Sequence, residues 1–235
     1  MTVTFQRATT TWEPSKHSGP PAAAACWRFL CRLFCLAVFL GSFTPAFAEK
    51  YLTIVDAQKV CFPEANRFEL RTFLLTEHDK AAIRKSVGLK PGVSEVKVWL
   101  AWKDHTLEGL LIADKVFGKH DAIDYLVALA PAGSVKQVEI LEYREQYGGE
   151  IHDPKWRAQF SGKTTASPLK LNEDIYNISG ATISCRHVTE GIKRVLATYD
   201  LVVRPQLRAS GDLDPREKPG TGPSQPAAPR HIRHD

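Results

Sequence analysis

The most informative residues of this chain are four small ones at positions 179–182, Ser-Gly-Ala-Thr. They stand directly before a segment with helical periodicity, residues 182–199. The start of a helix presents free backbone N–H groups and the positive end of the helix dipole, and both attract phosphate. A hydroxyl at this point is therefore well placed to hold a phosphate group. The alternative is that Ser179 or Thr182 only caps the helix, as such residues commonly do.

The element that must position these residues is the amphipathic helix predicted at 182–199. Its apolar face carries Val188, Ile192, Val195, Leu196 and Tyr199. Three shorter helices are predicted, at residues 55–61, 77–87 and 154–160.

Five segments have strand-like sequences: residues 68–75, 96–102, 107–117, 123–129 and 135–143. The links between the last four are short, which favours antiparallel pairing because parallel crossovers need a dozen or more residues. Such a sheet needs helices to cover a face. The sequence therefore predicts an α+β fold, an antiparallel sheet flanked by helices.

The first 48 residues are interpreted as a leader and signal peptide. Arg28 and Arg32 precede an apolar run at 33–43, and Ala46-Phe-Ala48 has the form of a cleavage site. The run is shorter than the roughly 20 apolar residues of a membrane span, which favours a cleaved signal over an N-terminal anchor. The sequence thus predicts export.

The last part of the chain, residues 204–235, is rich in Pro, Gly, Ser, Arg and Asp. Few large apolar side chains are present to offset the entropy of ordering, so a disordered tail is expected. The folded domain is expected to span residues 49–203.

Charge and cysteines exclude several classes of function. The formal net charge of +5 is modest, and aromatic residues are not interleaved with basic clusters, so no nucleic-acid partner is expected. After signal removal Cys61 and Cys185 remain. They either form a disulfide or are two separate, buried thiols that pack as small apolar side chains. The chain has no CxxC motif or His/Cys cluster with metal spacing, so no metal site is expected.

Two further segments can be placed beside Ser179–Thr182. Trp156-Arg-Ala-Gln-Phe-Ser-Gly-Lys163 and Glu145-Gln-Tyr-Gly148 precede it, and Asp174 and Ser184 flank it. In this order and spacing, residues 96–199 resemble the FMN-binding domain family. That domain is found in the covalently flavinylated subunits of sodium-translocating NADH:quinone reductases and of Rnf electron-transport complexes. The matching family segments are W-x-x-Q-F-x-G-K, E-T-P-G and S-G-A-T.

The resemblance implies that Thr182 carries FMN through a phosphoester, attached by a flavin transferase that uses FAD. The residue types agree with this role. Gly180 allows a close backbone approach, and Ala181 is too small to obstruct a phosphate. The N–H groups of Ile183 and Ser184 would face the phosphate oxygens. Ser-Gly-Ala-Thr alone favours the capping alternative, whereas the three segments together favour flavinylation.

Four other residues are candidate flavin contacts. Lys163 would contact the phosphate or the isoalloxazine by its charge, and the alternative is a solvated surface lysine. Glu145, Tyr147 and Gly148 would line the ring, although Gln and Tyr replace the Thr and Pro of the family segment. Trp156 and Phe160 are expected in the core.

The function implied by the resemblance is electron transfer, with the protein supplying attachment and orientation for FMN. The expected partners are membrane-bound redox proteins and the expected location is the periplasm. The alternative is a binding or assembly module for a membrane reductase complex that carries no flavin.

Overall fold

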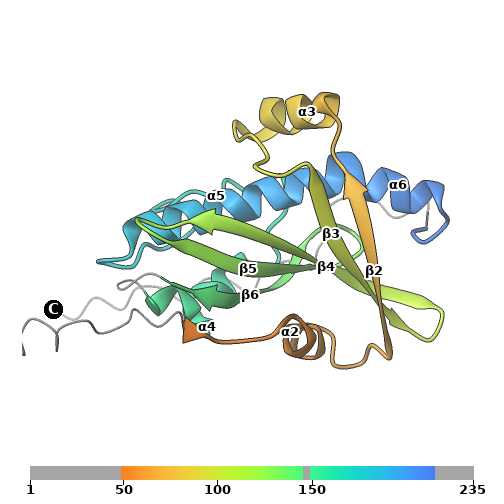
Figure 1. The fold of residues 1–235 in the computed structure, drawn as a ribbon, viewed down its shortest axis with the longest axis horizontal. Helices are drawn as coiled ribbons and strands as arrows, with labels where there is room; N and C mark the ends of the chain where they lie inside the picture. The colour runs from red at the N-terminus through yellow and green to blue at the C-terminus, as the bar shows by residue number, and fades with distance from the viewer. Residues whose placement is uncertain (1–48, 145–148, 215–235) are drawn as a thin grey trace, which may run out of the picture. The chain divides into compact units, whose positions relative to one another are not determined.

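An antiparallel sheet of six strands forms the centre of the computed structural model, which describes residues 49–144 and 149–214 (Figure 1). The strands are β1 (Glu49–Lys50), β2 (Arg67–Leu74), β3 (Glu95–Lys103), β4 (Thr106–Phe117), β5 (Ala122–Leu129) and β6 (Val135–Tyr143). Their order in the sheet is β1-β6-β5-β4-β3-β2. Each strand from β2 to β6 therefore pairs with its neighbour in the chain. The α+β fold predicted from the sequence is confirmed.

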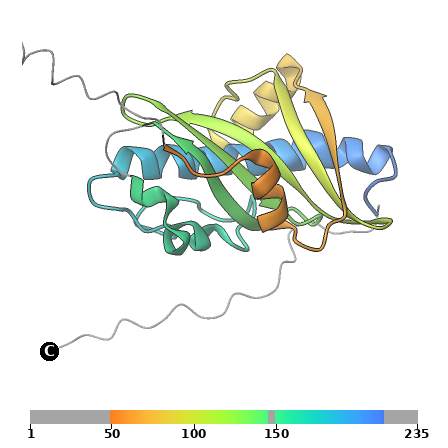
Figure 2. The ribbon, with the colours of Figure 1, turned by 60° about the horizontal axis from the view of Figure 1, so that its bottom comes forward.

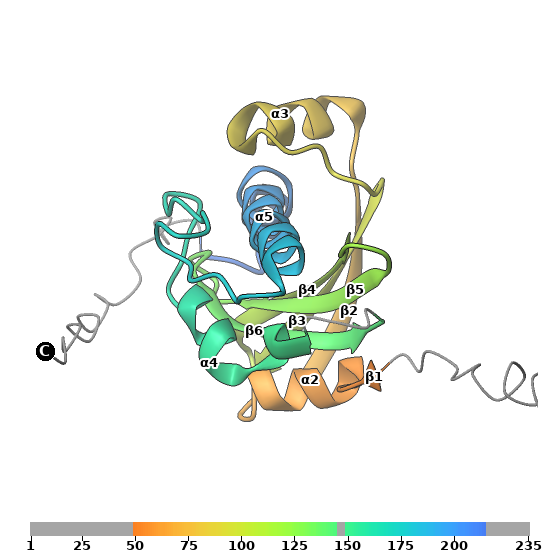
Figure 3. The same cartoon turned by 90° about the vertical axis from the view of Figure 1, so that its left-hand side faces the viewer.

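Helices cover both faces of this sheet (Figures 2 and 3). The long helix α5 (Thr182–Thr198) lies along one face with α3 (Glu77–Val87) beyond it, while α2 (Ile54–Cys61) lies on the opposite face. Three short helices follow β6: the 3₁₀-helix η1 (Gly149–His152), the α-helix α4 (Pro154–Arg157) and the 3₁₀-helix η2 (Ala158–Phe160). A long irregular loop then leads into α5. The predicted helices and strands are all present.

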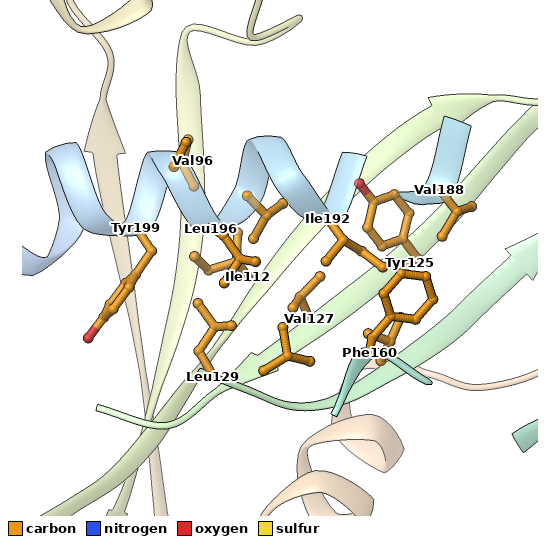
Figure 4. Close-up of a cluster of buried hydrophobic side chains, with 14 of the residues drawn as sticks. Val96, Ile112, Tyr125, Val127, Leu129, Phe160, Val188, Ile192, Leu196 and Tyr199 are labelled. Carbon is orange, nitrogen blue, oxygen red and sulfur yellow. The ribbon is translucent and has the colours of Figure 1, made fainter. Parts of the chain in front are cut away.

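The main core lies between α5 and the sheet. The apolar side chains predicted for the inner face of this helix are all buried: Val188, Ile192, Val195, Leu196 and Tyr199. In Figure 4, Ile192 and Leu196 point from the helix toward Val127 and Ile112 of the sheet. The 3.6-residue period of the sequence thus fixes which side of α5 faces the sheet.

A smaller core lies under α2 on the other face. Phe62 is fully buried there and packs with Leu111 and Leu126. A Cβ atom at Gly109 would lie 2.6 Å from the Phe62 ring, so only a residue without a side chain at position 109 leaves room for the ring. Both faces of the sheet are therefore buried near its middle strands.

The expectation of a disordered tail from residue 204 onward is wrong for residues 204–214. The helix continues through the π-helical turn η3 (Tyr199–Val203) into α6 (Arg204–Ala209). Leu207 is fully buried and Leu213 is 4% exposed, so this segment adds to the main core. Arg204 is also buried, and it forms an ion pair with Asp200 at 2.8 Å. The rest of the predicted tail, residues 215–235, and the predicted leader lie outside the described residues.

The role of α6 can be tested with two leucines near the end of the long helix. We expect Leu207→Ala to lower the free energy of unfolding by about 2–5 kcal/mol, because it leaves a cavity in the core. Leu201 is 43% exposed, so Leu201→Ala should change stability by about 0.5 kcal/mol or less. Urea unfolding of both variants measures the difference. Equal losses would contradict the packing of α6 onto the core.

Candidate functional site

Thr182 is the first residue of α5, and no side chain of a described residue caps this helix. The N-cap residue is Ala181, which has no side-chain hydrogen-bonding group. The first intrahelical bond links the Cys185 N–H to the Ala181 carbonyl at 2.9 Å. The N–H groups of the first turn have no partner of this kind and remain available for an anion. The capping alternative for Ser179 and Thr182 is therefore wrong.

The turn before α5 depends on Gly180. Its φ of 87° lies in the left-handed region, which L side chains rarely adopt. A Cβ atom there would meet nothing within 4 Å, so backbone conformation, not lack of space, requires glycine. Ser179 and Gly180 are exposed, whereas Ala181 is buried and anchors the turn. Ile183 is 40% exposed beside Thr182.

Within residues 49–144 and 149–214, the Thr182 hydroxyl has one hydrogen-bond partner, Asn177. The Nδ2 group of Asn177 donates a hydrogen bond to Thr182 Oγ1 at 2.9 Å. The Oδ1 atom of Asn177 is buried and receives no hydrogen bond from any described residue. The sequence interpretation missed this contact.

The Trp156–Lys163 segment holds the loop that leads to Thr182. Trp156 Nε1 donates a hydrogen bond to the Tyr176 carbonyl at 2.8 Å, and the Tyr176 N–H donates to Gln159 Oε1 at 2.6 Å. The backbone on both sides of Tyr176 is thus fixed. Trp156 and Phe160 are buried, as predicted, but the sequence analysis did not predict the two hydrogen bonds to the Tyr176 backbone. A buried indole N–H needs an acceptor, which was the available signal.

Lys163 contacts the same loop through Asp174. The two side chains are 12% and 15% exposed and lie 2.9 Å apart. Asp174 also accepts hydrogen bonds from the backbone N–H groups of Leu169 and Lys170. Burial opposes the charge of Asp174, but these N–H groups and the Lys163 ammonium together lower its pKa. Lys163 is thus not a solvated lysine, and its contact with a flavin stays a prediction.

Four predicted contacts remain, and the structure describes only Ser184 among them. Glu145, Tyr147 and Gly148 fall outside the described residues, so their predicted roles are not addressed by the structure. The Ser184 side chain is buried, with its hydroxyl 3.3 Å from Tyr143 Oη at the end of β6. Ser184 could therefore offer a phosphate its backbone N–H, but its hydroxyl faces the sheet.

A cavity of about 350 Å³ adjoins Thr182. Its lining includes the basic side chains of Lys170, Arg186 and Lys193, together with Glu190. Arg186 follows Thr182 by four residues, so both lie on one face of α5. The sequence interpretation missed this basic cluster, although the i, i+4 spacing was a signal for it.

Cys61 and Cys185 are free and buried, which decides between the alternatives left open above. Cys185 belongs to the main core and Cys61 to the smaller core on the opposite face of the sheet. Burial raises the pKa of the Cys61 thiol to about 12 and also raises that of Cys185. Neither thiol is a nucleophile at neutral pH, because only the thiolate reacts.

The family comparison matches the part of the chain that holds this site. Residues 118–197 match the model of the FMN-binding domain. The match covers about a third of the chain and shows that this part of it is similar to that domain. The matched segment begins later than the predicted 96–199 but contains Trp156, Lys163, Asp174 and Thr182.

The comparisons with solved structures and with curated sequences show less about this chain than the family model does. A solved structure, "Crystal structure of Shewanella oneidensis NqrC", is 15% identical to this chain with a TM-score of 0.46. The alignment covers 64% of this chain and 88% of that one. No curated protein sequence matches. Within residues 49–144 and 149–214, no helix has the length and apolarity needed to cross a membrane.

The contribution of Asp174 to the stability of the fold should depend on pH. Its pKa is lowered from 3.8 in the folded state, so its charged contacts stabilise the fold above that pH and are lost as the pH falls further. We expect Asp174→Asn to be less stable than wild type at neutral pH, with a gap that narrows below pH 3.8. Glu173→Gln is the control, because Glu173 is 53% exposed. Thermal melts across pH measure both, and a gap independent of pH would contradict the assignment.

Proposed function

We propose that this protein carries FMN covalently on Thr182 and transfers electrons between membrane-associated redox proteins. One observation carries the proposal. The Thr182 hydroxyl stands at an uncapped helix N-terminus and at the edge of a basic cavity. A phosphoester at this hydroxyl would place its anionic oxygens at the positive end of the helix dipole.

The residues present fit FMN. The cavity volume of about 350 Å³ falls within the range of small-molecule sites, roughly 300–1,000 Å³. Lys170, Arg186 and Lys193 supply positive charge for the phosphate.

Arg186 is the basic residue best placed to bind the phosphate. A helical side chain leans toward the N-terminus and covers the turn before its own Cα, which here is the turn of Thr182. Arg186 is exposed, and no described residue forms an ion pair with it. Its guanidinium is thus free to pair with the oxygens of a phosphodiester.

FMN supplies one- and two-electron redox chemistry when bound. The described residues attach it, orient it and neutralise its phosphate. They contain no group of three or more His, Cys, Asp or Glu side chains that could hold a metal.

The proposal includes location and maturation. The export signal predicted from the sequence of residues 1–48 supports a periplasmic protein, and a covalent bond would retain the cofactor there. The family resemblance supports a flavin transferase that uses FAD as the maturation partner. The family match itself supports FMN as the cofactor.

The test is covalent labelling of hydroxyl variants. The mature chain is produced with a flavin transferase, denatured, and examined by gel fluorescence and intact mass. Wild type and Thr182→Ser should carry one FMN, because both offer a hydroxyl. Thr182→Ala should carry none while losing only about 1 kcal/mol of stability, the value of one hydrogen bond.

Ser179→Ala is the matched control, since Ser179 is an exposed hydroxyl in the same turn. It should be labelled like wild type. Flavin on Thr182→Ala would show that the attachment site is wrong. A folded wild type that stays dark would instead favour the alternative function, a binding or assembly module without flavin.

A further inference from the structure

Asn177 precedes Thr182 by five residues and contacts the one hydroxyl that flavinylation would use. Its Nδ2 group donates a hydrogen bond to Thr182 Oγ1 at 2.9 Å. Its Oδ1 atom is buried and receives no hydrogen bond within the described part of the chain. An amide held with one half unsatisfied is costly, so packing alone does not explain it.

The backbone around Asn177 is fixed on both sides. Tyr176 is held by Trp156 and Gln159 through its carbonyl and its N–H. After Asn177, the Ile178 carbonyl accepts a hydrogen bond from the Ala181 N–H at 3.1 Å. These hydrogen bonds restrain the loop, so the side-chain amide of Asn177 is held next to Thr182.

We propose that Asn177 is a positioning residue for the attachment of FMN to Thr182. This inference rests on the proposed function. The amide N–H occupies one lone pair of Oγ1 and restrains the side chain of Thr182. The hydroxyl proton and the other lone pair then point away from Asn177, toward the reagent. The amide is neutral, so it does not repel the phosphates of FAD.

The step that Asn177 assists is a phosphoryl-group substitution. Thr182 Oγ1 forms a bond to the flavin-side phosphorus of FAD. The bond from that phosphorus to the bridging oxygen breaks, and AMP leaves with the electron pair. The hydroxyl proton passes to a base of the transferase. No oxidation or reduction occurs in this step.

The first test compares Asn177→Ala with wild type in time courses with transferase and FAD, followed by intact mass. We expect kcat to fall about tenfold for loss of one hydrogen bond to the reacting oxygen, with the KM for FAD unchanged. Asn66→Ala is the matched control, because Asn66 also makes an amide hydrogen bond, to Asp104 at 2.8 Å, in another part of the fold. It should react like wild type.

Asn177→Asp separates hydrogen-bond donation from shape, because it keeps the size of the side chain and removes the donor. We expect it to react at least as slowly as Asn177→Ala near neutral pH. Its rate relative to wild type should rise as the pH is lowered from about 8 to 5. Burial raises the pKa of the introduced carboxyl, and the protonated carboxyl can donate a hydrogen bond to Thr182 Oγ1. Thermal melts of each variant check that the fold is kept.

The outcomes separate the two proposals. If wild type is labelled and Asn177→Asp reacts at the wild-type rate near neutral pH, the role of Asn177 is wrong and flavinylation stands. A rate of Asn177→Ala equal to that of Asn66→Ala has the same meaning. If wild type itself is never labelled, the proposed function fails before the role of Asn177 is reached.

Discussion

The close approach of helix α5 to the sheet at Gly191 is the constraint on which the site depends. A Cβ atom at Gly191 would overlap the Tyr125 hydroxyl, so no other residue allows this approach without a shift. Val188 and Ile192 are fully buried on either side of it. The helix can therefore neither rotate nor move outward without opening the core. Thr182 lies nine residues earlier, roughly 14 Å along the axis, and its position follows from that contact.

A buried polar cluster adds a second restraint at the same level of the helix. The carboxylate of Asp114 accepts hydrogen bonds from Tyr125 and Arg194, both at 2.5 Å. The Arg194 and Asp114 side chains are 17% and 11% exposed, and burial raises the pKa of Tyr125 well above its ordinary value. Buried ion pairs of this kind add little net stability, because desolvation offsets the attraction. These hydrogen bonds can instead form in only one register of α5 against β4 and β5, so they favour that register.

The elements of this fold could be predicted from the sequence because each follows from local periodicity. Val188 and Ile192 of α5, for example, repeat at the spacing of one helical face. The tail was predicted wrongly because Leu207 and Leu213 are two apolar residues in a polar composition, and their burial depends on a distant core surface. The contact between Asn177 and Thr182 could not be predicted either, since it depends on how an irregular loop folds.

That loop also explains why the Trp156–Lys163 segment and Ser-Gly-Ala-Thr together are more specific than Ser-Gly-Ala-Thr alone. The tetrapeptide supplies a hydroxyl and a left-handed turn, but an irregular backbone has no internal ladder to hold it. The Trp156–Lys163 segment supplies that support twice, through Trp156 and Gln159 to Tyr176 and through Lys163 to Asp174. Each contact acts a few residues before Thr182. A chain with the tetrapeptide but without these partners would present the same hydroxyl on an unrestrained loop, with no fixed position relative to the start of α5 or to Asn177.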